Sequence, residues 1–137
     1  MEVFRGWPAD AKGITFEPCK WRIMIHKSTI EALGMPEYVR FLFNAEKRRF
    51  AVQACGMHDD GAEKLPKLQS GDGGYVYCMF LVQYVFKTCG WNAEYTHRVA
   101  GILYPREKLV DFDLNHFWEL RWEEVTGVEQ GGNDDPD

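Results

Sequence analysis

The chain has 137 residues and a net charge of −5 at pH 7, and 45% of its residues are hydrophobic. This length is typical of a single domain, and the apolar content excludes a chain that is disordered throughout. Residues 1–56 hold nine Lys/Arg and six Asp/Glu, whereas residues 57–137 hold seven and fifteen. Such asymmetry predicts that the basic and acidic halves face different partners or each other.

The location of the protein is inferred from its N-terminus and its cysteines. The first ten residues lack the apolar core of a signal peptide, and the four cysteines show no pairing rhythm. The longest apolar run, residues 75–86, is shorter than a bilayer-spanning helix and is interrupted by Gln83. We therefore expect a cytoplasmic protein with no membrane partner.

The first half of the chain predicts a compact βαββ unit within residues 20–56. Residues 1–19 are expected to be irregular, because Gly13 and two prolines interrupt them. Residues 21–26 alternate apolar and polar side chains, which is typical of a half-buried strand. A capping box from Ser28 to Glu31 begins a short helix over 29–33, and Gly34 ends it. Residues 38–43 and 49–55 alternate again and are predicted to form a hairpin.

The second half predicts a similar succession of elements after a polar linker at 57–74. The expected elements are a buried helix over 75–88, strands over 94–104 and 109–117 around the tip 105–108, a short helix near Trp118 and Trp122, and an acidic, disordered tail within 118–137. Residues 75–117 would then be a degenerate repeat of the first unit. The predicted fold class is α+β, with a small β-barrel-like sheet built from two βαββ-like units in one domain and one buried helix.

The stretch from residue 21 to residue 53 resembles the AbrB/MazE/SpoVT swapped-hairpin family. The resemblance is carried by the strand, the short helix ending in Leu-Gly, and the hairpin with a charged tip: Arg22, Ile23, Ile25, Leu33, Gly34, Val39, Phe41, Phe43, Glu46, Ala51 and Val52. His26 stands where the family usually has a proline. The resemblance implies homodimers that interlace hairpins into a small barrel and bind DNA at one end. With an internal repeat, a single chain would build both halves of that barrel, so either a monomer or a homodimer is expected.

The basic residues of the first half suggest a nucleic-acid surface. The candidate phosphate-contacting residues are Arg22, Lys27, Arg40, Lys47, Arg48 and Arg49. Phosphate binding requires several cations on one face, because each contact releases about one counterion. The simpler interpretation is a solvated hairpin tip with charges along strand edges, which natural sheets commonly carry. The first hypothesis is therefore an AbrB-like transcriptional regulator that binds duplex DNA.

The acidic second half suggests a different partner. A row of carboxylates can imitate nucleic acid and block a basic, nucleic-acid-handling protein, as an anti-CRISPR-like inhibitor from a phage or mobile element would do. The candidate residues are Asp111, Asp113, Glu123 and Glu124. In a strand, Asp111 and Asp113 share a face, and the simpler interpretation is that this face is solvated.

No catalytic or metal-binding motif stands out from the sequence. Cys55 and His58 have ligand-like spacing but lack a second such pair, and residues 71–74 lack the Lys-Ser/Thr of a phosphate-binding loop. We therefore expect a binding protein that is not an enzyme and has no metal or cofactor.

Overall fold

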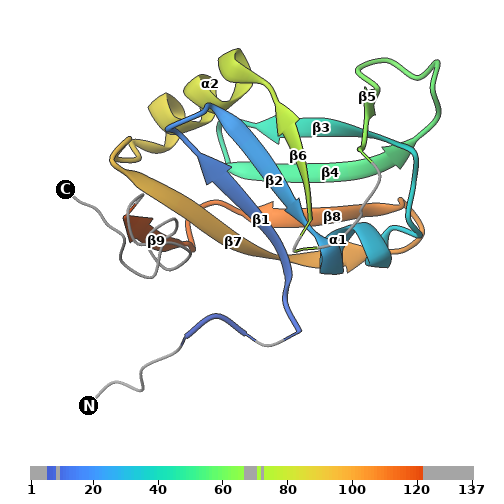
Figure 1. Cartoon of the computed structure of the whole chain (residues 1–137), viewed down its shortest axis with the longest axis horizontal. Coiled ribbons are helices and arrows are strands. Elements are labelled where there is room, and N and C mark those ends of the chain that lie inside the picture. Colours follow the sequence, from blue (N-terminus) through green and yellow to red (C-terminus); the bar gives the residue numbers. More distant parts are fainter. Residues whose placement is uncertain (1–5, 9, 67–70, 72, 122–137) are drawn as a thin grey trace.

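The computed structural model of the chain describes residues 6–8, 10–66, 71 and 73–121. Its strands form one sheet in the order β5-β3-β4-β8-β7-β1-β2-β6, with β9 added beside β7. Consecutive neighbours in this order are antiparallel. The sheet curls into a nearly closed barrel, with β1 and β2 in the wall opposite β3 and β4 (Figure 1). The fold is thus mostly β with two helices, and the barrel-like part of the predicted fold class is confirmed.

The described elements follow one another closely along the chain. The strands are β1 (Lys12–Glu17), β2 (Arg22–His26), β3 (Tyr38–Asn44), β4 (Arg49–Cys55), β5 (Glu63–Lys64), β6 (Gly73–Tyr77), β7 (Tyr95–Tyr104), β8 (Leu109–Asp113) and β9 (Trp118–Arg121), and the helices are α1 (Lys27–Ala32) and α2 (Met79–Cys89). The predicted strands at 21–26, 38–43, 49–55 and 94–104 are therefore confirmed, and the predicted strand at 109–117 ends early, at Asp113.

The core fills the barrel with side chains that alternate along each strand. Ile23 and Ile25 of β2, and Phe50 and Val52 of β4, are fully buried. Helix α2 closes one end of the barrel by turning Val82, Val85 and Phe86 into this core. We call this end the α2 end and the opposite end, where α1 lies, the α1 end (Figure 1).

Contacts of α2 show which loops meet at the α2 end. Phe86 packs edge-on against Trp21, just before β2, at 5.9 Å between ring centroids. Tyr84 packs in the same way against Phe43, near the end of β3, at 5.5 Å. Because neighbouring strands are antiparallel, the start of β2 and the end of β3 both lie at this end, whereas the end of β2 and the start of β3 lie at the α1 end.

The predicted capping box of α1 is wrong, whereas the predicted end of the helix is confirmed. No side chain caps the first turn; the Ser28 and Thr29 hydroxyls instead donate to the carbonyls of Ala11 and Gly13, at 2.8 and 2.7 Å. They bind the helix to the start of β1, a tertiary contact that the local pattern does not contain. Gly34 adopts φ +85°, and a backbone bond of 2.9 Å runs from the next N–H to the Ile30 carbonyl.

The predicted linker at 57–74 and the predicted helix at 75–88 both need correction. The linker region contains β5, and residues 73–77 form β6, so the helix begins only at Met79. In β6, Val76 is buried opposite Ile23 of β2, whereas Tyr75 and Tyr77 point outward. A strand thus passes directly into a helix, and the continuous apolar run conceals the boundary.

Two further predictions fail because tertiary contacts override local signals. Within the supposedly irregular residues 1–19 lies β1, whose Gly13 provides space for ring packing: a Cβ there would lie 2.4 Å from the His26 ring and 2.6 Å from Trp7. The short helix expected near Trp118 is instead strand β9, which pairs with the first part of β7. Trp122 and the predicted disordered tail after it lie outside the described residues.

Candidate functional site

The predicted phosphate-contacting residues divide between the two ends of the barrel. Arg22 begins β2 and Lys47 and Arg48 follow β3, so these three lie at the α2 end. Lys27 follows β2 and Arg40 lies near the start of β3, so these two lie at the α1 end. Arg49 begins β4 and lies at the α2 end as well. The six residues therefore do not share one face, and the α2 end gathers four of them.

Arg22 is held in place by aromatic and acidic neighbours. Its Nε donates to the Glu17 carboxylate at 2.6 Å, and its Nη1 donates to the Tyr77 hydroxyl at 2.9 Å. The guanidinium also lies 3.7 Å from the centroid of the Tyr75 ring. Burial by itself lowers the pKa of Arg22, but the hydrogen bonds to Glu17 and Tyr77 outweigh it and the pKa is raised. Arg22 is thus a fixed cation in contact with Tyr77, the residue two positions before the start of α2.

Lys47 and Arg48 form an exposed tip beside α2. The Lys47 N–H donates to the Asn44 side chain at 3.1 Å, and Arg48 adopts φ +55°. Phe43, near the end of β3, packs against Tyr84 of α2 with 5.5 Å between ring centroids, so the turn that follows β3 lies beside this helix. Burial raises the pKa of the Cys89 thiol in α2, and the charge of Arg48 opposes that increase. The 11 residues of α2 span about 16 Å.

Arg49 was predicted to contact nucleic acid, but it contacts Asp111 and Asp113, which were predicted to contact a basic partner protein. Its guanidinium forms an ion pair with Asp111 and lies 3.8 Å from Asp113, across the β4–β8 pairing. Burial by itself raises the pKa of Asp113, but hydrogen bonds from Asn115 and His116 outweigh it and the pKa is lowered. Arg49 thus offsets one of the two negative charges of these carboxylates. Glu123 and Glu124 lie outside the described residues.

The two cations at the α1 end also have partners. Arg40 Nε donates to the Gln53 side chain at 2.9 Å, and its Nη1 donates to the Asp60 carbonyl at 3.4 Å. Lys27 lies 4.0 Å from Glu31, one turn along α1. Both pairs are local contacts, and neither brings these cations towards the α2 end.

Exposed aromatic side chains lie between the basic groups of the α2 end. Phe80 is 79% exposed, Tyr77 66% and Tyr84 52%, which is unusual for large apolar groups. Phe80 and Tyr84 are four residues apart and lie on the same face of α2. The sequence interpretation missed them by treating residues 75–88 as wholly buried. The signal was Gln83 and Lys87, which mark the solvent face of the helix at the same spacing.

We call these groups together the basic–aromatic surface. It is made of Lys20, Arg22, Lys47, Arg48, Lys87, Tyr77, Phe80 and Tyr84, contributed by the β1–β2 turn, β2, the β3–β4 turn, β6 and α2. Glu46, Glu94 and Glu119 are exposed acidic residues at the same end, and Asp113 also lies there beside Arg49, whereas Glu17 is buried against Arg22. The four exposed cations of this surface, Lys20, Lys47, Arg48 and Lys87, outnumber these three exposed acids only narrowly, although the whole molecule is acidic.

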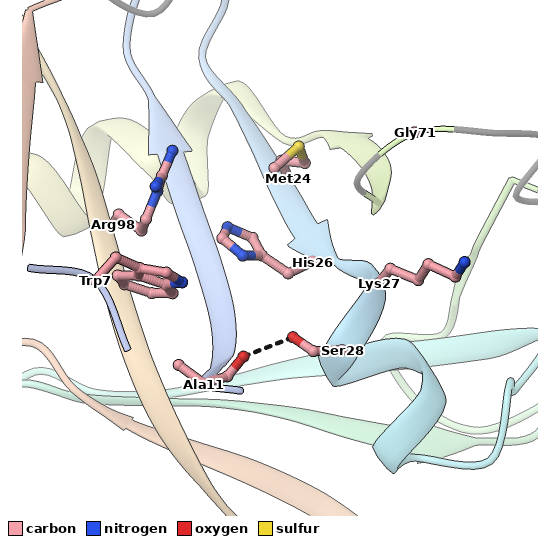
Figure 2. Close-up of a pocket in the computed structure, with 8 residues that line it drawn as sticks. All are labelled: Trp7, Ala11, Met24, His26, Lys27, Ser28, Gly71 and Arg98. Atoms are coloured by element: carbon pink, nitrogen blue, oxygen red, sulfur yellow. Dashed lines mark hydrogen bonds between the residues drawn. The ribbon is translucent and has the colours of Figure 1, made fainter. Parts of the chain in front are cut away.

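A separate pocket lies on the outer wall of the barrel, over β1, β2 and β7. It has a volume of about 300 Å³, and its walls include Trp7, Met24, His26, Lys27, Ser28 and Arg98. Figure 2 shows the His26 ring directed towards Trp7 and Arg98, whereas Lys27 extends away from them. The His26 Nε2 lies 2.7 Å from the Thr15 hydroxyl. Sequence reasoning did not find this pocket, because Trp7 reaches it from outside the predicted elements.

Three of the four cysteines do not resemble activated nucleophiles. Burial raises the pKa of the Cys78 thiol to about 11, and it also raises the pKa values of Cys55 and Cys89. These thiols stay protonated at neutral pH, which is the unreactive form. In the part of the chain that the structure describes, no three His, Cys, Asp or Glu side chains are grouped as metal ligands would be.

Comparisons with known proteins give no family assignment: no family model, curated protein or solved structure matches this chain. Among the described residues, no helix has the length and apolar character needed to cross a membrane.

Proposed function

We propose that this protein is a non-enzymatic DNA-binding protein and that DNA binds along the basic–aromatic surface at the α2 end. The observation that carries the proposal is the position of the cations. Arg22 bonds to Tyr77 just before α2, and the turn that carries Lys47 and Arg48 lies beside α2, where Phe43 packs against Tyr84. The exposed rings of Phe80 and Tyr84 lie on the same helix. Cations that follow a phosphate backbone, interleaved with rings that stack on bases, are the two components of nucleic-acid grooves.

The charge distribution supports a small footprint on DNA. The four exposed cations of the basic–aromatic surface, Lys20, Lys47, Arg48 and Lys87, can each replace about one condensed counterion on a phosphate, whereas Arg22 is already paired with Glu17. Elsewhere the molecule is acidic and repels the same polyanion. The proposed contact is therefore confined to the α2 end, and the binding constant should depend strongly on salt.

A second part of the proposal concerns the architecture, in which each half of the chain supplies one half of the barrel. Two reciprocal backbone bonds support it. The Arg48 carbonyl accepts from the Leu114 N–H, and the Lys108 carbonyl accepts from the Ala54 N–H, both at 2.9 Å. Arg48 and Lys108 are both turn residues with φ near +55°. Ala54 lies six residues after Arg48, and Leu114 lies six residues after Lys108, so each half of the chain donates to the other from the same position.

The helix ends and the strand order support the same relation. Trp91 N–H bonds to the Phe86 carbonyl after Gly90, as Met35 N–H bonds to the Ile30 carbonyl after Gly34. If β5 and β6 are neighbours around the barrel, the eight strands β1–β8 form a closed ring. Replacing β1, β2, β3 and β4 by β5, β6, β7 and β8, and the reverse, then gives each strand the same neighbours as before. A single chain would then provide what the AbrB/MazE/SpoVT-like resemblance assigns to a dimer.

The alternative, an acidic inhibitor that imitates nucleic acid, receives less support. Its surface requires Asp111 and Asp113 to face a basic partner, and Arg49 already pairs with Asp111 and lies beside Asp113, which offsets one of their two negative charges. It would be favoured if the protein captured a basic partner from a nuclease-treated lysate and lost that partner when Asp111 and Asp113 were changed to Asn.

The proposal is tested by fluorescence anisotropy of labelled DNA at increasing salt concentrations. We expect binding at low salt, with the logarithm of the binding constant falling linearly as the logarithm of salt concentration rises. Single-stranded and duplex oligonucleotides of the same sequence are compared in parallel. No binding of either form at low salt would exclude the DNA-binding function.

A further inference from the structure

The pocket over β1, β2 and β7 is independent of the basic–aromatic surface, and the strand register explains how it forms. Thr15 of β1 lies opposite Met24 of β2 on one side and Arg98 of β7 on the other. Side chains alternate between the two faces of a strand, so the neighbours Ile14, Phe16 and Val99 point into the core. Arg98, Thr15 and Met24 therefore form a row on the outer wall.

The N-terminal segment adds an aromatic wall to this row. The Trp7 ring lies 5.5 Å from the His26 ring and 5.2 Å from the Arg98 guanidinium. The edge of Trp118 in β9 supports Trp7 from another side, at 4.9 Å between ring centroids. Gly13 has no side chain to fill the space beneath the two rings. Trp7 and His26 thus lie directly on the strand backbone and leave a hollow beside them (Figure 2).

Hydrogen bonds hold the polar walls of the pocket in position. The His26 Nε2 is 2.7 Å from the Thr15 hydroxyl, and Thr15 itself is only 4% exposed. Ser28 Oγ donates to the Ala11 carbonyl at 2.8 Å, which joins the N-terminal segment to α1 at the pocket floor (Figure 2). The site is therefore formed before any ligand arrives, and little ordering is required on binding.

The described lining of the pocket includes an arginine and a histidine. Arg98 brings a permanent positive charge to its walls, and His26 adds a ring with hydrogen-bonding nitrogens. Lys27 also lines the pocket, but its side chain extends away from Arg98 and lies 4.0 Å from Glu31. No Asp or Glu lines it within the described residues. A volume of about 300 Å³ lies at the lower end of the range for small-molecule sites.

We propose that this pocket binds a small organic anion, whose carboxylate or phosphate group contacts Arg98 and whose flat ring lies against Trp7. The planar guanidinium of arginine offers donors in the fork geometry that both anionic groups accept. The indole ring of Trp7 provides a flat apolar wall beside that charge. His26, positioned by Thr15, lies between the two.

The proposal is tested by isothermal titration calorimetry of the full chain with four probes. Adenosine monophosphate and benzoate carry a ring and an anionic group, adenosine carries only the ring system, and inorganic phosphate carries only the charge. We expect at least one ringed anion to bind at least about tenfold more tightly than adenosine or inorganic phosphate. Preference for adenosine monophosphate would identify a phosphate ligand, and preference for benzoate a carboxylate. No binding of either ringed anion, or equal binding of adenosine, would overturn the proposal.

Variants then assign the contacts to residues. Arg98→Gln should weaken binding of the ringed anion about tenfold or more, because a hydrogen-bonded charge pair is lost. Arg106→Gln, at an exposed hairpin tip, is the matched control and should leave the affinity unchanged. If circular dichroism shows that Arg98→Gln does not fold, Arg98→Lys replaces it, because lysine keeps the positive charge but lacks the forked N–H donors of arginine. Trp7→Ala should weaken the ringed anion but not inorganic phosphate. Unchanged affinity in the folded Arg98 variant and in Trp7→Ala would contradict the assignment.

Discussion

His97 is the buried titratable residue whose behaviour follows most directly from its surroundings. Its side chain is fully buried, and its ring stacks on Trp91 with centroids 4.3 Å apart and planes 8° apart. Its Nε2 lies 3.2 Å from the Glu119 carboxylate of β9. Burial lowers the pKa of His97, although Glu119 opposes the shift. The neutral ring is therefore the form that the folded protein prefers.

This preference predicts a loss of stability in mild acid. The unfolded chain takes up a proton at His97 near the ordinary pKa of about 6.5, whereas the folded chain resists it. The free energy of unfolding should fall as pH drops below about 6.5, by at most about 1.4 kcal/mol per pH unit for one group. Urea unfolding between pH 7.5 and pH 5 measures the slope.

Two variants isolate His97 in that measurement. His97→Phe keeps a ring against Trp91 and should reduce the slope. His58→Gln is the control, because the His58 side chain is exposed and has no hydrogen bond or ion pair among the described residues, and it should keep the wild-type slope. The same slope in His97→Phe and in the wild type would contradict the account.

At the scale of elements, α2 performs two tasks with its two faces. Val82, Val85 and Phe86 close the barrel, whereas Phe80 and Tyr84 face solvent between the basic groups. An exposed aromatic face contributes little to folding, so its presence requires a different reason. Stacking with bases provides one, and unpaired bases offer more of their ring surface than the bases of a duplex.

Phe80→Ala should therefore change DNA binding without changing stability. The substitution removes a 79% exposed side chain, so the free energy of unfolding should change by less than about 0.5 kcal/mol. Affinity for a single-stranded oligonucleotide should fall at least about fivefold, since stacking contributes about 1–3 kcal/mol per base. Anisotropy titration measures this affinity. Tyr104→Ala, at the α1 end, is the control, and an equal loss in both variants would argue against stacking on α2.

Some helices and strands of this protein can be predicted from the sequence, and others cannot. The β3–β4 hairpin follows from strict alternation on both sides of a polar turn, and Gly34 signals the end of α1 locally. Strand β1 was missed because Gly13 resembles a loop residue, and only the rings of Trp7 and His26 explain it. Strand β6 was missed because it enters α2 without a break. Strand β9 was missed because the tryptophan spacing suggested a helix.

The candidate site was predictable only in part, for a related reason. The cations of the hairpin tip are visible in the sequence, and the structure places them at the α2 end. The pairing of Arg49 with Asp111 depends on β4 lying beside β8, 62 residues later in the chain. The rings of α2 and the pocket at Trp7 also depend on packing between distant segments. Local patterns do not contain such contacts.

At the scale of the whole molecule, one chain supplies a nearly closed barrel, so it should be monomeric. Light scattering coupled to size-exclusion chromatography should give the mass of one chain, 15.9 kDa. The expectation follows from the strand order, in which β4 pairs with β8 and β2 pairs with β6 within the chain. Twice that mass at low micromolar concentration would indicate that hairpins are instead shared between two chains.

The whole-molecule charge pattern makes the central claim directly testable, because the two hairpin tips provide a matched comparison. Lys47→Gln with Arg48→Gln removes two charges at the α2 end. Arg106→Gln with Lys108→Gln removes two charges at the opposite end, and Arg48 and Lys108 share the same turn conformation. The two double variants therefore change net charge and turn chemistry in parallel.

The decisive measurement is the affinity of these two double variants for labelled DNA, compared with the wild type at the same low salt concentration. The account predicts that the Lys47/Arg48 variant binds several-fold more weakly and has a salt dependence smaller by about two counterions, whereas the Arg106/Lys108 variant stays close to the wild type. Equal weakening of both variants, or no weakening of the first, would contradict DNA binding at the α2 end.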